Sequence, residues 1–242
     1  MKRYTDIFID FDDTLYDTYG NAVIALKETF EHFALGRYFD QPQVFYDAYW
    51  QANIDLWGRY SRGEISRDYL ILERFRRPLC ASEVLRKKYE TIAADFETYT
   101  LKVGDVFLDF CSNKPGVIEG AHELMSYLKK RGYRLHMCSN GFHEVQYKKL
   151  AACGLNDAFD TIILSEDAGA NKPASAFYDY ALQQSGARKS STVMIGDNFQ
   201  TDILGAMRAG LDTIFFNRWQ QSVATNPPTY QVDKLKEIIH IL

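Results

Sequence analysis

Four short polar segments carry side chains of the kinds that suit phosphoryl transfer. They are Asp10-Phe11-Asp12-Asp13-Thr14, Ser139-Asn140-Gly141, Lys172-Pro173, and Gly196-Asp197-Asn198 with Asp202 further on. Asp10 and Asp12 are two residues apart, so both side chains point to one side while the chain is extended. Carboxylates that lie close together repel one another unless a cation compensates. Mg²⁺ is the natural choice, because it binds through one or two carboxylates, waters and a substrate phosphate.

The other polar residues fit a phosphate-binding role beside this metal. Lys172 supplies a second positive charge, and the Ser139 hydroxyl with nearby backbone N–H groups can hold phosphate oxygens. Asn140 either contacts the phosphate or shapes its loop. Asp202 either supports the metal from its second sphere of ligands or complements the dipole of a helix N-terminus. Asp13 is interpreted as a turn residue, because aspartate is common in turns.

Five apolar or β-branched segments are predicted to be buried strands that position these polar residues. The predicted strands are Ile7–Ile9, Arg134–Cys138, Thr161–Leu164, Thr192–Ile195 and Thr213–Phe216. Helical patterns lie between them at Glu119–Arg131, Phe177–Ser185 and Ile203–Ala209. This alternation predicts an α/β fold, a Rossmann-like parallel sheet covered on both faces. Ligands bind beyond the carboxyl ends of such strands, so the four polar segments are expected to converge.

The alternation is interrupted by a helical insertion between the first two strands. We predict a core domain of residues 1–16 and 115–242 and an inserted α-helical cap domain of residues 17–114. Inside the insertion, Ser66 is a candidate N-cap after a turn at Gly63, and Pro78 interrupts the chain before a helix that starts near Ser82. The end of the insertion is expected between Val103 and Pro115, where glycine, asparagine and proline cluster.

Composition excludes several other classes of protein. Apolar residues make up 46% of the 242 residues, which excludes disordered and fibrous chains. With 28 basic and 32 acidic residues the net charge is −4, which gives no broad footprint for nucleic acid or an anionic membrane. The four cysteines form no CxxC pair and are expected to be reduced. We expect a cytoplasmic monomer or homodimer that acts on a small phosphorylated metabolite, without a membrane span.

The four segments, in this order and at these strand ends, resemble the motifs of the haloacid dehalogenase (HAD) superfamily of hydrolases. Asp10-Phe11-Asp12-Asp13-Thr14-Leu15 resembles the first motif, and Ser139 in Cys-Ser-Asn-Gly the second. Lys172 in Asn-Lys-Pro resembles the third, and Gly196-Asp197 followed by Asp202 the fourth. The helical insertion resembles that family's C1-type cap.

The resemblance implies a mechanism with a covalent intermediate. Asp10 would be the nucleophile that forms an aspartyl-phosphate, and Asp12 would protonate the leaving oxygen and then activate water. The implied Mg²⁺ ligands are Asp10, the backbone carbonyl of Asp12, and Asp197. Ser139 and Lys172 would bind the phosphoryl group. The implied supporting residues are Thr14 and Asp202.

The resemblance also narrows the expected reaction. Family members that remove halide lack the acidic residue at the position of Asp12, so phosphate-ester chemistry is favoured over carbon–halogen chemistry. A narrower resemblance points to the bacterial pyrimidine 5′-nucleotidase branch and hence to a nucleoside 5′-monophosphate substrate. It rests on Ser139-Asn140-Gly141, Gln146, Lys149-Leu150, Gly154-Leu155, Phe159-Asp160, Ser165-Glu166 and Lys172-Pro173. Alternatives are a 2-haloacid dehalogenase, a phosphoglycolate or sugar-phosphate phosphatase, a phosphomutase, and a non-catalytic protein that only binds a phosphorylated ligand.

Other conspicuous residues have ordinary structural explanations. Aromatic residues of the insertion could stack a nucleobase, but most are expected to fill the core of a helical bundle. They include Tyr46, Tyr49, Trp50, Trp57 and Tyr60. The arginines between Arg59 and Arg77 are expected on solvated faces, although one could reach the substrate. The five histidines and Cys138 are interpreted as structural residues.

Overall fold

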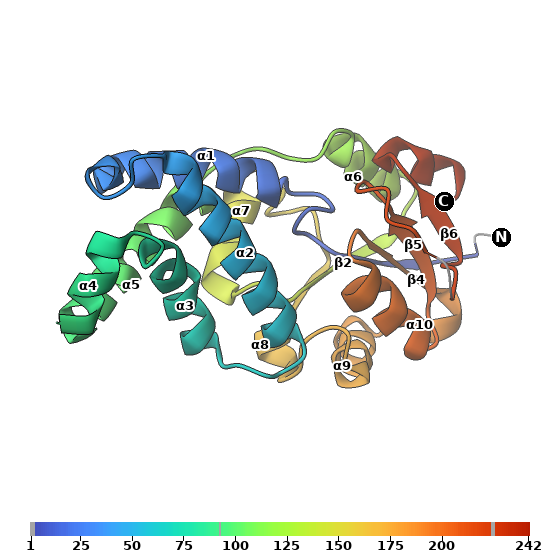
Figure 1. Ribbon diagram of the computed structural model, residues 1–242. Helices are drawn as coiled ribbons and strands as arrows, with labels where there is room; N and C mark the ends of the chain where they lie inside the picture. The colour runs from blue at the N-terminus through green and yellow to red at the C-terminus, as the bar shows by residue number, and fades with distance from the viewer. Residues whose placement is uncertain (1–2, 92, 224–225) are drawn as a thin grey trace. The chain divides into compact units, whose positions relative to one another are not determined.

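The computed structural model describes residues 3–91, 93–223 and 226–242 (Figure 1). Its contacts group the residues up to Tyr19 with Pro115–Leu242 as one compact unit, which we call the core unit. Gly20–Lys114 form the second, the cap unit. In the described part of the chain, no helix combines the length and the apolar character needed to cross a membrane.

The core unit is built on a six-stranded sheet in which every pair of neighbouring strands is parallel. The strand order is β3-β2-β1-β4-β5-β6. The strands are β1 (Asp6–Ile9), β2 (Arg134–Ser139), β3 (Thr161–Leu164), β4 (Thr192–Gly196), β5 (Asp212–Phe216) and β6 (Tyr230–Val232). The α/β fold class and the five predicted strands are confirmed. The three-residue edge strand β6 was missed, because so short a segment has no recognisable pattern.

The two faces of the sheet are covered by different helices (Figure 1). Ile7 and Ile9 of β1 belong to one apolar cluster and Phe8 to another, as alternation along a strand requires. The first cluster includes residues of α6 (Ala121–Lys130), α7 (His143–Ala152) and the 3₁₀ turn Leu235–His240. The second includes residues of α9 (Ser175–Ser185) and α10 (Gly205–Arg208). The strands are therefore buried on both sides, which explains their continuous apolar runs.

The segment after β4 differs from the helix predicted at Ile203–Ala209. A π-helical turn spans Phe199–Leu204 and continues into the short helix α10. A Cβ on Gly205 would lie 2.9 Å from atoms of both Pro173 and Tyr178. The close approach of these two residues is a tertiary contact, so the local sequence pattern could not reveal where the α-helix begins.

The cap unit is helical, as predicted. Its elements are α1 (Thr18–His32, which starts in the core unit), the 3₁₀ turn Leu35–Arg37, α2 (Pro42–Ser61), α3 (Arg67–Leu79), α4 (Glu83–Thr91) and α5 (Ala93–Ser112). Ser66 caps α3, because its Oγ accepts the N–H of Tyr69 at 3.2 Å. Pro78 lies inside the last turn of α3 rather than after the helix. Helix α5 continues through Gly104, where the ring of Phe75 packs 3.4 Å from the position of a Cβ.

Aromatic side chains fill the interior of the cap unit. Tyr49, Phe75 and Phe107 are buried, and their ring centroids are 5.1–5.3 Å apart. The core interpretation of the cap aromatics therefore holds for Tyr49 and for Tyr46 and Trp50, which are partly buried and pack against this core. Trp57 and Tyr60 are partly buried and do not belong to this core among the described residues.

Arg62, just after α2, is exposed and pairs with Glu64 at 2.5 Å. The expectation of solvated arginines is wrong for Arg74, which is buried, while Arg59, Arg67, Arg76 and Arg77 are partly buried.

Candidate active site

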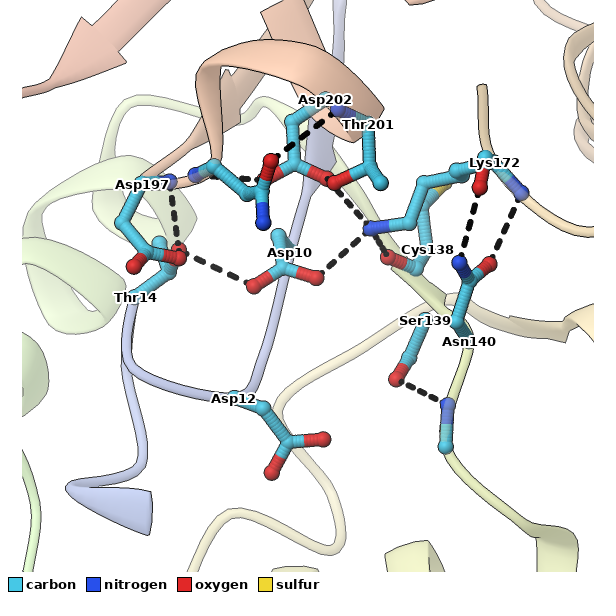
Figure 2. A network of polar contacts seen from close by, with 12 residues as sticks. Asp10, Asp12, Thr14, Cys138, Ser139, Asn140, Lys172, Asp197, Thr201 and Asp202 are labelled. Carbon is cyan, nitrogen blue, oxygen red and sulfur yellow. Dashed lines mark hydrogen bonds and ion pairs between the residues drawn. The ribbon is translucent and has the colours of Figure 1, made fainter. Parts of the chain in front are cut away.

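The predicted site residues gather at the carboxyl edge of the sheet (Figure 2). Asp10 follows β1, Ser139 ends β2, and Asp197 follows β4. Because β1 lies between β2 and β4, Asp10 leaves the sheet at the centre of this group. Lys172 arrives from the loop after α8 (Ser165–Ala168), which follows β3. Strand order thus brings together residues that are far apart in the sequence.

Lys172 is the central cation of the site. Its side chain is 2% exposed, and Nζ donates to Asp10 Oδ1 at 2.6 Å, to Asp202 Oδ1 at 2.7 Å and to the carbonyl of Cys138 at 2.7 Å. Burial would lower the pKa of Lys172, but the two carboxylates outweigh it and raise the pKa. Asn140 fixes this loop, since its side chain bonds the N–H and the carbonyl of Lys172 at 2.8 and 2.9 Å. Asn140 therefore shapes the loop.

Three carboxylates form a cluster around this lysine. Asp10, Asp197 and Asp202 each offer an oxygen, and these oxygens lie within 4.8 Å of one another. The Thr14 hydroxyl lies between two of them, 3.0 Å from Asp10 Oδ2 and 3.2 Å from Asp197 Oδ1. Asp202 is oriented into the cluster by the N–H of Asn198 at 3.0 Å, and also lies in the π-helical turn.

The negative charge of the three carboxylates is only partly compensated by Lys172, so a further cation would stabilise the cluster. Burial raises the pKa of Asp10 to about 7, although Lys172 opposes that rise. Burial and then repulsion from Asp10 and Asp202 raise the pKa of Asp197 well above its usual value. Among the residues that the structure describes, Asp197 forms no ion pair with a lysine or arginine. Crowded, partly uncompensated carboxylate oxygens are the donor set that Mg²⁺ prefers.

Glycine is required immediately before Asp197. A Cβ on Gly196 would lie 2.4 Å from Asp202 Oδ2 and 2.5 Å from its Cβ. Only a residue without a side chain leaves Asp202 room to reach the cluster, which gives the Gly196-Asp197 pair a steric explanation.

The Asp12 carboxylate lies apart from this cluster (Figure 2). Its Oδ1 accepts the Thr18 hydroxyl at 2.6 Å and forms an ion pair with Lys149, and its Oδ2 accepts Gln146 Nε2 at 2.5 Å. Burial alone would raise the pKa of Asp12, but Lys149 and the hydrogen bonds lower it overall. Asp13 has φ of 60°, in keeping with a turn residue.

Ser139 is held by two donors. Its Oγ accepts the N–H of Gly141 at 3.0 Å and Gln146 Nε2 at 2.9 Å. Sequence reasoning included Gln146 and Lys149 only in the narrower family resemblance and assigned them no role. Their spacing of three residues on the helix that follows Ser139 was the available signal.

His136 and Cys138, both interpreted as structural residues, have side chains outside this network. His136 is buried beside Asp6, with Nε2 3.1 Å from Asp6 Oδ1, at the start of β1. Cys138 is a buried free thiol whose pKa is raised by burial. Only the backbone carbonyl of Cys138 contacts the site, through Lys172.

An open parallel sheet, a helical insertion after β1 and an acidic cluster with a buried lysine define an α/β protein with a candidate metal site at the carboxyl edge of its sheet. The family model of haloacid dehalogenase-like hydrolases matches residues 7–210, and the chain belongs to this family. The family resemblance deduced from the four motifs is confirmed.

Several other proteins are similar to this chain over most of their length. The HAD-hydrolase YfnB of Bacillus subtilis is 31% identical over 244 residues, covering 100% of this chain and 97% of YfnB. Its magnesium-bound crystal structure, which reveals interdomain movement, aligns with a TM-score of 0.82 over 99% of both chains. The pyrimidine 5′-nucleotidase PynA of Streptococcus pneumoniae is 30% identical, covering 99% of this chain and 95% of PynA. A glyceraldehyde 3-phosphate phosphatase of Methanothermobacter thermautotrophicus is 31% identical, covering 87% and 84%.

Proposed function

We propose that this HAD hydrolase is a Mg²⁺-dependent phosphatase that cleaves small phosphomonoesters, with nucleoside 5′-monophosphates as its substrates. The observation that carries the proposal is the pairing of Asp10, inside the acidic cluster, with a second carboxylate, Asp12, outside it. One carboxylate is then available for nucleophilic attack and the other for proton transfer.

The chain's own residues supply each part of the reaction. Lys172 donates to one oxygen of Asp10 and Thr14 to the other, which fixes the orientation of this carboxylate. Asp10 attacks phosphorus, the bond to the leaving oxygen breaks, and an aspartyl-phosphate forms. Asp12, which takes up a proton before this step, gives it to the departing oxygen. The carboxylate that remains is stabilised by Lys149, Gln146 and Thr18. That carboxylate then accepts a proton from the water that hydrolyses the aspartyl-phosphate, which returns Asp12 to its protonated form.

The metal site uses the acidic cluster. Asp10 and Asp197 would hold Mg²⁺ together with the backbone carbonyl of Asp12, while Asp202 supports the site from its bond to Lys172. When bound, Mg²⁺ offsets the charge of these carboxylates and of the phosphate oxygens. Ser139 and Lys172 are the proposed phosphate-binding residues.

The same features disfavour the alternative activities. Carbon–halogen cleavage requires no proton for an alkoxide leaving group, so it gives Asp12 no function. The similarity to a dehalogenase crystal structure, at 20% identity and a TM-score of 0.70, concerns the fold alone. The nucleotide substrate is supported by the similarity to PynA, whereas the glyceraldehyde 3-phosphate phosphatase makes a sugar phosphate the second candidate.

The proposal is tested by phosphate release from a panel of esters with Mg²⁺ or with EDTA. The panel contains pyrimidine and purine 5′-monophosphates, phosphoglycolate, glyceraldehyde 3-phosphate, hexose phosphates and an aryl phosphate. We expect Mg²⁺-dependent release with the highest kcat/KM on nucleotides. Preference for another ester would refute the nucleotide assignment, and no release from any ester would refute the phosphatase.

Two variants test the roles of the carboxylates. Asp10→Asn is expected to abolish turnover, and Asp12→Asn to lower it about 10²- to 10⁴-fold, the usual contribution of a general acid or base. Asp13→Asn is the matched control, because it removes a neighbouring charge and asparagine tolerates the positive φ. Substantial hydrolysis by Asp10→Asn would exclude Asp10 as the nucleophile.

A further inference from the structure

Helix α7, which follows Ser139, directs two long polar side chains inward. Gln146 and Lys149 are three residues apart and therefore share one face of the helix. Gln146 is 0% exposed and Lys149 only 6%. Lysine is rarely buried to this extent without a charged partner. Such burial indicates a specific use for both side chains.

Both side chains hold the carboxylate of Asp12. Lys149 Nζ forms an ion pair with Oδ1, and Gln146 Nε2 donates to Oδ2 at 2.5 Å. The Thr18 hydroxyl also donates to Oδ1, at 2.6 Å. With donors on both oxygens, the carboxylate cannot rotate without breaking a charge-assisted hydrogen bond.

Gln146 also connects Asp12 to Ser139. Its Nε2 donates to Ser139 Oγ at 2.9 Å, and the N–H of Gly141 donates to the same oxygen at 3.0 Å. A hydroxyl oxygen has two acceptor sites and one proton. Because both acceptor sites are filled, the Ser139 proton is directed to a third atom. A phosphate oxygen of the substrate would be its natural acceptor.

The backbone at Gly141 leaves room for the side-chain amide of Gln146. A Cβ on Gly141 would lie 1.6 Å from Gln146 Nε2, so glycine leaves the space that the amide occupies. Gln146 Oε1 is buried and has no hydrogen-bond partner among the described residues. Burying this oxygen without a partner costs free energy. The two hydrogen bonds donated by Nε2, to Asp12 and Ser139, offset that cost and hold the amide in place.

We propose that Gln146 and Lys149 are positioning residues for proton transfer: together they hold Asp12 in place for the leaving oxygen, and Gln146 ties it to the phosphate-binding Ser139. This inference rests on the proposed function, in which Asp12 is the general acid. It predicts that replacing either residue lowers kcat/KM more for a leaving group that must be protonated than for one that departs as a stable anion.

The leaving group provides a readout that a merely structural role would not affect. A nucleoside 5′-monophosphate releases an alkoxide, which must be protonated, whereas p-nitrophenyl phosphate releases a stable phenolate. kcat/KM reports the steps up to departure of the leaving group, and the later hydrolysis of the aspartyl-phosphate is common to both substrates. The ratio of the two kcat/KM values is also independent of the fraction of folded enzyme.

The experiment measures this ratio for Gln146→Leu, Lys149→Met and Lys149→Arg with saturating Mg²⁺. We expect Lys149→Met to lower kcat/KM on the nucleotide about 10- to 100-fold and on the aryl ester less than about threefold. Gln146→Leu also loses the bond to Ser139, which binds the phosphate of both esters, so kcat/KM should fall on both, and about 10-fold more on the nucleotide. Lys149→Arg should restore part of the loss. The matched control is Lys148→Met, an exposed neighbour on α7, which should leave the ratio unchanged.

The outcomes separate this inference from the proposed function. Equal losses on both esters, or no loss, would overturn the positioning role of Gln146 and Lys149. Asp12→Asn is measured in parallel. If Asp12→Asn also leaves the ratio unchanged, the assignment of Asp12 as general acid fails. If Asp12→Asn shifts the ratio while the α7 variants do not, only the present inference fails.

Discussion

Replacing Lys172 with methionine removes the ammonium group that lies between two buried carboxylates. The substitution deletes hydrogen bonds of 2.6 Å to Asp10, 2.7 Å to Asp202 and 2.7 Å to the carbonyl of Cys138. Breaking a buried ion pair from one side costs about 3–5 kcal/mol, because the remaining charges stay buried. We expect the metal-free protein to lose about that much free energy of unfolding at pH 8.

The loss should depend on pH in a defined direction. The raised pKa of Asp10, about 7, means that the folded protein binds this proton more tightly than the unfolded chain does, so stability falls as pH rises from about 4 toward 7. Without Lys172, which opposes the rise, that pKa increases further, and one unit corresponds to about 1.4 kcal/mol. Lys172 itself has a raised pKa and stays charged between pH 5 and 8. The cost of Lys172→Met should therefore be smaller at pH 5 than at pH 8, by up to about 1.4 kcal/mol for each unit by which the pKa of Asp10 rises.

Urea unfolding in EDTA, followed by tryptophan fluorescence, measures these differences. Lys172→Met/Asp202→Asn restores the balance of charge and should be at least about 1 kcal/mol more stable than the sum of the single effects. The control Lys189→Met breaks only an exposed pair with Asp179 at 3.6 Å and should cost less than about 1 kcal/mol. A loss below about 1 kcal/mol for Lys172→Met at pH 8, or no coupling with Asp202→Asn, would refute the reasoning.

Three other perturbations have defined outcomes. Gly196→Ala forces a Cβ against Asp202, so urea unfolding should show a loss of about 1–3 kcal/mol and titration a weaker Mg²⁺ site. Mg²⁺ at about 100 times its Kd should stabilise the wild type by about 2.7 kcal/mol in thermal unfolding but leave Asp197→Asn unchanged; an equal shift in the variant would exclude Asp197 as a ligand. Asp6→Ala leaves the buried Nε2 of His136 without its 3.1 Å partner and should lower stability by about 1–3 kcal/mol at pH 7 without changing kcat. Loss of the pair with Arg134 adds little, because the Arg134 side chain is half exposed and water solvates it. Because its pKa is lowered in the fold, the effect of Asp6 should shrink as pH falls below about 4, and a pH-independent effect would contradict this.

The convergence of the site could be deduced without coordinates. Asp10, Ser139 and Asp197 each follow a strongly apolar segment, and parallel strands end at one edge of a sheet. The strands were recognised as short, continuous apolar runs, which arise because both faces of the sheet are buried. Edge strand β6 and the π-helical turn before α10 were not recognised, because one is too short and the other depends on contacts with Pro173 and Tyr178.

By itself, the sequence determined the types of residue, their order and the strand ends that carry them. The sequence could not determine which of these side chains contact one another. Lys172 contacts Asp10 across 162 positions and Lys149 contacts Asp12 across 137. Such pairs form only if α7 and the loop after β3 lie close enough to the end of β1. The packing of these elements determines that distance. Tertiary structure therefore decided that Asp12 lies apart from the acidic cluster, since a carboxylate follows its hydrogen-bond donors and not its neighbours in the chain.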